Sequence, residues 1–299
     1  MSSEIVKHSD RTHWLNGRAT SIGSSDAAVI LGHGYAGSSI YSLWSEKCKG
    51  LTPEYAESTM AMFAKGQLAE PYIGGLCKLE QGWDAQFDPP FSYRRNAQRP
   101  YLTASLDAWM IQDEQECVLE FKALSGWMGR DWDAKTGKAP LKYTIQVQHQ
   151  LAVTGWQKGY LVGLHGFDLH VVEVRRHDAL IAAMLAEYAD FWQYVTSGTE
   201  PPIDDSEATH EALKRVYPAL KLSAEHLGDS GSRVVTEFVE AERQLAADAK
   251  ALDRMRNELV KIIGGAEYVV TTDGQWYSFK SSRGGKRVLK PHNGKVKVR

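Results

Sequence analysis

The chain has 299 residues, of which 43% are hydrophobic and 24% are charged, as in an ordinary soluble globular protein. No apolar run approaches a membrane span, and the N-terminus lacks the apolar core of a signal peptide, so we expect a cytoplasmic protein without a membrane partner. The net charge of −2 argues against a protein that coats nucleic acid through bulk charge. Three cysteines are too few for an iron–sulfur cluster with four thiolate ligands and indicate reduced thiols.

Helical and strand-like segments alternate along the first two thirds of the chain. We predict helices over 12–50, 58–83, 141–155 and 179–195. Ser24 or Ser25 is expected to be the N-cap of the helical segment Ala27–Leu31. Short strands are predicted within 91–122 and, as a hairpin, over 158–164 and 169–174. This order predicts an α/β (α+β) fold with a mixed sheet flanked by helices.

The composition changes after residue 198, which suggests three parts: a core over 1–198, a linker or surface strap over 199–231, and an accessory region over 232–299. The accessory region is expected to hold a long helix and a small hairpin. Apolar residues recur every seven positions along that helix, which predicts a helical partner within the chain or on another subunit. They are Phe238, Leu245, Leu252 and Leu259.

Basic residues are concentrated at the C-terminus. Residues 280–299 hold eight lysines and arginines and no acid, whereas the rest of the chain has 27 basic against 37 acidic residues. The eight are Lys280, Arg283, Lys286, Arg287, Lys290, Lys295, Lys297 and Arg299. This tail either supplements phosphate binding or is a solvated terminus.

The most informative pattern is an aspartate followed by an acid and a base in an apolar strand. Twelve residues separate Asp107 from Glu120, and Lys122 shares a strand face with Glu120 because successive side chains alternate. Buried charges are costly unless they are paired or bind a metal. Asp107, Glu120 and the carbonyl of Phe121 could therefore hold Mg²⁺, with Lys122 beside the attacking water. The alternative is a solvated strand preceded by a turn-ending aspartate.

The metal-site interpretation is supported by the segments around this pattern. Taken with it, they give five blocks in the following order: Trp14–Arg18, Ile22–Gly32, Gly66–Pro71, Asp107 with Glu120 and Lys122, and Pro140–Gly155. In this order they resemble the YqaJ-like, phage lambda-type 5′→3′ exonucleases of the PD-(D/E)XK nuclease superfamily. Leu106 replaces the usual proline and Ala108 the usual glycine, but neither change removes a ligand. The resemblance implies a restriction-endonuclease-like core with a C-terminal helical extension.

The resemblance also assigns roles to side chains outside the strand. Glu70 would supply a further carboxylate, directly or through water, and Gln146 would help to position the nucleophile beside Lys122. Gln150 shares the helix face of Gln146, whereas Gln148 does not. Without the surrounding segments, Glu70 and Gln146 would be taken as surface residues. Residues 123–142 mix basic and aromatic side chains, which suits either DNA contact or packing.

A second group of residues is expected to bind the terminal 5′-phosphate of the degraded strand. The resemblance implies this role for Arg18, Ser25 and Ser105. A guanidinium can donate two parallel hydrogen bonds to phosphate oxygens, and a serine at a helix N-terminus adds its hydroxyl and a backbone N–H as further donors. We expect Ser105 to project from a strand on the same side as Asp107. Ser25 could equally be a simple helix cap.

The function implied by the resemblance is a Mg²⁺-dependent exonuclease, for which Mn²⁺ can substitute. It would degrade one strand of duplex DNA from the 5′ end and leave a 3′ single strand for an annealing protein in phage-type recombination and repair. Lambda-type relatives form toroidal homotrimers. Two alternatives stay open: an endonuclease or nickase of the same fold, and an inactive scaffold that binds DNA ends.

Overall fold

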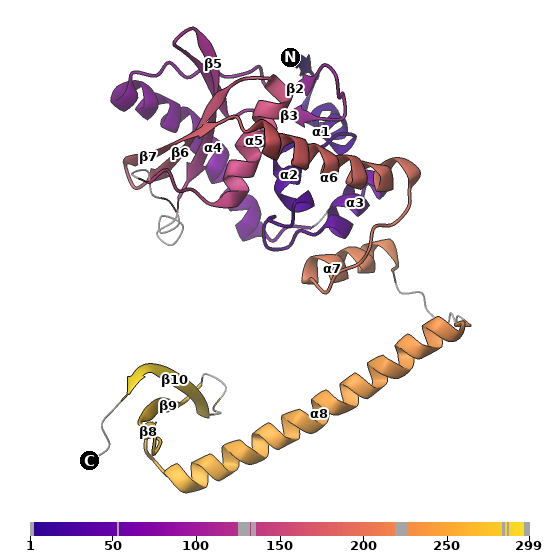
Figure 1. Cartoon of the computed structure of the whole chain (residues 1–299), viewed down its shortest axis with the longest axis vertical. Coiled ribbons are helices and arrows are strands. Elements are labelled where there is room, and N and C mark those ends of the chain that lie inside the picture. The colour runs from indigo at the N-terminus through magenta and orange to yellow at the C-terminus, as the bar shows by residue number, and fades with distance from the viewer. Residues whose placement is uncertain are drawn as a thin grey trace. The chain divides into compact units, whose positions relative to one another are not determined.

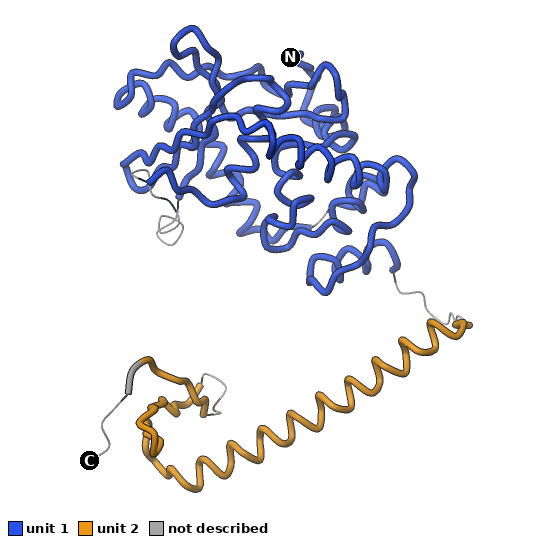
Figure 2. Tube along the Cα trace, in the orientation of Figure 1, with its two compact units in different colours: residues 1–219 blue, residues 220–299 orange. Residues whose placement is uncertain are grey.

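The computed structural model describes residues 3–52, 54–124, 132, 136–218, 226–282, 285 and 287–295. The chain divides into two compact units, residues 1–219 and 220–299, each described here by itself (Figure 2). Part of the segment predicted to be a linker belongs to the first unit, because helix α7 (Glu207–Val216) packs against α3 (Ile40–Lys49). None of the helices in the described ranges is long and apolar enough to cross a bilayer.

The first unit is built on a four-stranded sheet with the order β4–β5–β6–β7 (Figure 1). The strands are β4 (Ala108–Gln112), β5 (Gln115–Ala123), β6 (Lys158–His165) and β7 (Asp168–Arg175). The β4–β5 and β6–β7 pairs are antiparallel hairpins, whereas β5 and β6 are parallel. A parallel pair needs a crossover, which helix α5 (Leu141–Thr154) supplies. The mixed sheet predicted from the sequence is confirmed.

Helices cover both faces of this sheet, and alternate residues of β5 serve the two faces. Leu119 and Phe121 pack with Ile73 of α4 (Glu57–Gln81) in one core cluster. Val118 packs with Val147 of α5 in another. Phe121 is only 4% exposed and packs on the α4 side of the sheet. Its side chain therefore lies on the face opposite Glu120 and Lys122, as the strand periodicity requires.

The rest of the first unit is helical and carries a small second sheet. Helices α1 (Arg11–Ala19), α2 (Ser24–Ile30), α3 and α6 (Asp178–Ser197) occupy this part, together with strands β1 (Ser3–Lys7), β2 (Ser92–Asn96) and β3 (Thr103–Ala104). The continuous helix predicted over 12–50 is wrong, because turns at 20–23 and 31–39 break it into three. Two of these turn glycines, Gly32 and Gly37, have positive φ values of 71° and 86°, which a helix cannot accommodate.

The N-cap of α2 also differs from the prediction. Gly23, and not Ser24 or Ser25, occupies the cap position. The carboxylate of Asp26 accepts a hydrogen bond of 2.8 Å from the Gly23 N–H and so forms half of a capping box. Ser24 and Ser25 are the first two residues of the helix, so their hydroxyls are not needed for capping.

The second unit consists of α8 (Asp229–Ile263) and a three-stranded antiparallel sheet with the order β10–β9–β8. Helix α8 has no buried residue, and the seven-residue stripe is open to solvent: Phe238, Leu245 and Leu252 are 62%, 71% and 57% exposed. Strands β8 (Tyr268–Val270) and β9 (Gln275–Ser281) form the predicted hairpin. The third strand, β10 (Arg287–Lys295), was not predicted.

Candidate active site

Asp107 lies in the short connection between β3 and β4, directly before Ala108. The expectation that Ser105 and Asp107 belong to a strand is therefore wrong. The placement of Asp107 is nevertheless fixed, because its Oδ2 accepts a 2.8 Å hydrogen bond from the backbone N–H of Phe121. This bond brings the aspartate to the middle of the Glu120–Lys122 segment across 14 positions of sequence.

Glu120 and Lys122 lie on the α5 face of β5, as the strand periodicity predicts. The Lys122 ammonium pairs with Glu120 Oε1, and the Gln150 amide donates to Glu120 Oε2 over 2.6 Å. Glu120 is only 5% exposed. The ammonium also lies 5.2 Å from the centre of the Tyr143 ring. The buried carboxylate is thus held between a cation and a neutral amide.

Burial and like charge shape the protonation of this site. Burial raises the pKa of Asp107 well above its ordinary value, and the Glu120 and Glu70 carboxylates raise it further. Burial, followed by Glu120, raises the pKa of Glu70. Burial alone would lower the pKa of Lys122, but Glu120 and Asp107 together raise it, so the ammonium stays charged. Acids clustered in this way do not all stay ionised on their own. Their negative charge is neutralised by bound protons or by a cation.

The donor chemistry of the site fits a hard divalent cation. Asp107 and Glu120 offer carboxylate oxygens, and burial of the Asp107 carboxylate disfavours its ionised form unless positive charge is nearby. Within the described residues, however, no group of three His, Cys, Asp or Glu side chains is close enough to hold an ion. Glu70 is therefore an electrostatic neighbour of the other two acids, and its part in metal binding stays a prediction.

The glutamines of α5 take different positions. Gln146 Nε2 lies 3.4 Å from the hydroxyl of Tyr35, whereas Gln148 donates to the carbonyl of Arg175 at the far end of β7. The prediction that Gln148 faces away from the site is confirmed. Gln146 and Gln150 each carry a buried Oε1 atom without a hydrogen-bond partner. Such atoms are costly to leave unpaired and mark places where a ligand or water would bind.

Tyr35, in the loop between α2 and α3, was missed by the sequence analysis. The ammonium of Lys142, on α5, lies 4.5 Å from the centre of the Tyr35 ring. Burial raises the pKa of the Tyr35 hydroxyl. A cavity of about 560 Å³ lies next to these residues, lined by the loop at 33–34 and by residues 138–142. No local signal marks Tyr35, because it enters the site through the packing of α2 against α5.

The predicted phosphate-binding residues come from neighbouring segments. Ile22 pairs in parallel with Leu102, and the Ile22 carbonyl accepts a 2.9 Å bond from the N–H of Thr103. The start of α2 therefore runs beside the segment that leads to Ser105. The hydroxyls of Ser24 and Ser105 are both buried and lack a hydrogen-bond partner.

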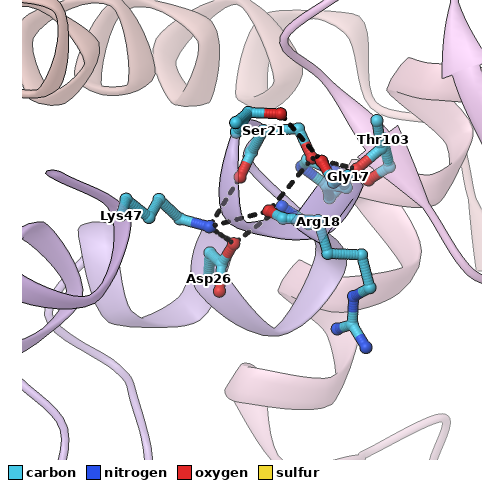
Figure 3. A network of polar contacts seen from close by, with 9 residues as sticks. Gly17, Arg18, Ser21, Asp26, Lys47 and Thr103 are labelled. Carbon is cyan, nitrogen blue, oxygen red and sulfur yellow. Dashed lines mark hydrogen bonds and ion pairs between the residues drawn. The ribbon is translucent and has the colours of Figure 1, made fainter. Parts of the chain in front are cut away.

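Arg18 reaches the same place from α1. Its guanidinium lies next to Gly23 and 4.7 Å from the centre of the Trp14 ring. Figure 3 shows the guanidinium pointing away from Lys47 and Asp26, so it remains outside their network. The backbone carbonyl of Arg18, in contrast, accepts a hydrogen bond of 3.4 Å from Lys47.

Lys47 holds the helices of this region together (Figure 3). Its side chain is 4% exposed, and its ammonium contacts Asp26 Oδ2 at 2.7 Å and the Ser21 carbonyl at 2.6 Å. The Ser21 hydroxyl in turn contacts the Thr103 hydroxyl at 2.8 Å. This network joins α3, the cap of α2 and β3, and so fixes the segments that carry Arg18 and Ser105. The sequence analysis did not find it.

The basic and aromatic segment over 123–142 is described only in part. Trp132 is 5% exposed and belongs to the core cluster around α5, so it is a packing residue. Trp127, Arg130 and Lys135 lie outside the described residues.

The segment that contains the site is similar to a known protein family. Residues 13–157 match the YqaJ-like viral recombinase domain. The matched segment includes every predicted site residue, namely Arg18, Ser25, Glu70, Ser105, Asp107, Glu120, Phe121, Lys122 and Gln146.

Relatives extend the similarity beyond the YqaJ-like domain. The uncharacterized protein YqaJ of Bacillus subtilis (strain 168) is 26% identical over 271 residues, which cover 88% of this chain and 82% of the relative. The crystal structure of LHK-Exo in complex with dAMP superposes with a TM-score of 0.51 at 22% identity, covering 69% of this chain and 97% of that one. A second structure, of the alkaline exonuclease LHK-Exo from Laribacter hongkongensis, has a TM-score of 0.50 at 19% identity, covering 70% and 100%. These structures share the fold.

Proposed function

We propose that the protein is a Mg²⁺-dependent exonuclease that degrades one strand of duplex DNA in the 5′→3′ direction. The observation that carries this proposal is the Asp107–Phe121 hydrogen bond of 2.8 Å, which brings the aspartate onto the strand where Lys122 pairs with Glu120. The fold shared with LHK-Exo, which is named an alkaline exonuclease, supports it. The product would be a 3′ single strand for an annealing protein.

Asp107, Glu120 and the Phe121 carbonyl would hold the metal, with Glu70 nearby, and Mn²⁺ would substitute for Mg²⁺. When bound, the metal supplies a Lewis acid for the phosphate and a bound water of lowered pKa. Lys122 remains protonated and offsets the negative charge that develops on the phosphate during attack. Gln150 orients the Glu120 carboxylate through their 2.6 Å bond.

Gln146 is suited to place the attacking water. Its Oε1 is buried without a hydrogen-bond partner, while its amide is turned towards Tyr35. An amide oxygen accepts hydrogen bonds, so it can hold a water molecule by one proton. The pKa of Tyr35 is raised by burial, so its hydroxyl remains a neutral donor or acceptor at physiological pH.

A 5′-phosphate pocket would give the enzyme its direction. Arg18 supplies charge, the N-terminal turn of α2 supplies backbone N–H groups, and Ser25 and Ser105 supply hydroxyls. The unpartnered Ser105 hydroxyl, two residues from Asp107, is the atom that links this pocket to the catalytic carboxylates. A terminal phosphate held there would expose the first phosphodiester bond to hydrolysis.

The test uses end-labelled linear duplexes and covalently closed circles, each incubated with Mg²⁺, with Mn²⁺ or with EDTA. We expect metal-dependent release of nucleotides from 5′-phosphorylated ends and no cleavage of circles. Cleavage of circles would identify an endonuclease or nickase, and binding without hydrolysis in any metal would identify a scaffold for DNA ends. The resemblance to lambda-type relatives also implies a homotrimer, which light scattering on the same samples tests.

A further inference from the structure

The three-stranded sheet of the second unit presents two chemically different faces. One face includes Tyr277 and Phe279, and Phe279 is only 1% exposed. Arg287 lies over the Phe279 ring at 4.2 Å and donates to the carbonyl of Gly264, so the chain leaving α8 closes this side. On the opposite face, Tyr268 and Val270 are 51% and 44% exposed, whereas Ser278 at the centre is 8% exposed.

This opposite face is defined by the cross-strand register and is called the aromatic face here. Tyr268, Ser278 and Lys290 are aligned across the three strands, as are Val270, Trp276 and His292, and Lys280 lies opposite Val288. Neighbours in each row project to the same side of a sheet. The face therefore combines three aromatic rings with two lysines.

The rings of the aromatic face form a continuous surface. Trp276 and His292 are stacked, with centroids 4.2 Å apart and planes inclined by 15°. Tyr268 lies 6.1 Å from Trp276 and is 51% exposed. His292 also carries a buried Nε2 atom with no hydrogen-bond partner. Trp276 and His292 are partly buried, so Tyr268 is the exposed ring of this surface. An exposed ring next to a buried polar atom without a partner marks a place where a ligand would bind.

Positive charge borders these rings. Lys280 lies 4.5 Å from the centre of the Tyr268 ring and 3.2 Å from a carboxylate oxygen of Glu267. Lys290 is exposed on the neighbouring strand. A cavity of about 350 Å³ is lined by residues of this face, among them Tyr268, Ser278, Lys280, Lys290 and His292. Lysines beside rings match the alternation of phosphates and bases in a nucleic acid strand.

We propose that the aromatic face is a binding site for single-stranded DNA, with bases stacked on Trp276 and Tyr268 and phosphates contacted by Lys280 and Lys290. Duplex DNA hides the faces of its bases within the helix, so exposed rings distinguish unpaired strands. The site goes beyond the proposed nuclease, because it lies in the other unit and needs no metal. In a nuclease of the proposed kind, it would bind the strand that hydrolysis leaves unpaired.

The test measures the affinity of the full-length protein for a fluorescent single-stranded oligonucleotide and for the matching duplex, both in EDTA. Because no cleavage occurs, failure here is separate from failure of the proposed nuclease. We expect tighter binding of the single strand. Trp276→Ala should weaken that binding about fivefold or more, since each base–ring stack contributes about 1–3 kcal/mol. Trp276→Phe should retain most of it.

Two controls separate stacking from charge and from misfolding. Phe167→Ala removes an aromatic ring that is 81% exposed in the first unit and should leave binding unchanged. Lys290→Ala should flatten the salt dependence of binding, whereas Lys250→Ala, on exposed α8, should not. Circular dichroism of each variant checks the fold.

Photocrosslinking gives a direct readout that does not depend on a variant. A bromodeoxyuridine oligonucleotide should crosslink within residues 268–292, as identified by mass spectrometry. Crosslinks confined to residues 1–219 would overturn the proposal. It would also be overturned by a folded Trp276→Ala variant with wild-type affinity for the single strand, or by a variant that loses duplex affinity as much as single-strand affinity.

Discussion

Lys122 is the residue whose replacement best separates catalysis from folding. Its ammonium pairs with Glu120, and the two side chains are 19% and 6% exposed. In Lys122→Met, Glu120 would keep only the 2.6 Å bond from Gln150. Breaking a buried ion pair costs about 3–5 kcal/mol. Because Lys122 is partly solvated, we expect a loss of about 2 kcal/mol in the free energy of unfolding.

The same change should slow hydrolysis at least about a thousandfold, equivalent to about 4 kcal/mol of barrier, because a charge opposite the reacting phosphate is lost. The double variant Glu120→Gln/Lys122→Met removes the unpaired charge and should recover most of the lost stability. It should not recover activity. Stability and rate would thus respond differently to the second substitution.

Urea denaturation in EDTA measures the stability of each variant, and initial rates on a 5′-phosphorylated duplex with Mg²⁺ measure catalysis. Lys250→Met, an exposed lysine on α8, is the control and should shift stability by no more than about 0.5 kcal/mol. A Lys122→Met rate within tenfold of wild type would refute the catalytic role. Equal instability of the single and double variants would refute the ion-pair argument.

Three further predictions concern the surroundings of the site. The wild-type enzyme should prefer 5′-phosphorylated over 5′-hydroxyl ends roughly tenfold or more, since a charge-assisted contact contributes about 1.5–3 kcal/mol. Arg18→Ala should remove most of this preference. Equal wild-type rates on both kinds of end would remove the basis for the pocket. Lys47→Met should destabilise the protein by about 3–5 kcal/mol, because it leaves Asp26 without its buried partner, and an unchanged melting temperature would contradict the role of the network. Burial lowers the pKa of His149, so the folded state resists its protonation, and stability should fall as pH drops below about 6.5. His149→Gln should flatten that dependence in pH-resolved urea titrations, and a wild-type slope in the variant would show that other groups cause it.

Local periodicity determined much of the fold from the sequence. The alternation in β5 correctly separated Glu120 and Lys122 from Phe121, because a strand leaves each residue only two directions. Helices α4 and α5 and the β6–β7 hairpin lie within a few residues of their predicted bounds. Strand β5 and its acid–base pair were thus available without tertiary information.

Tertiary packing alone decided which side chains meet. The resemblance implies that Gln146 helps to position the nucleophile beside Lys122, and that role stays a prediction. The structure adds that Gln150 is the amide that reaches Glu120, whereas Gln146 contacts Tyr35 across 111 positions. Both glutamines share a helix face, so only the depth at which α5 sits on the sheet selects between them. Lys47 likewise gains its role from burial against α2 and the turn that precedes it. Periodicity fixes the direction of a side chain along its own element, whereas contacts between elements depend on how those elements pack.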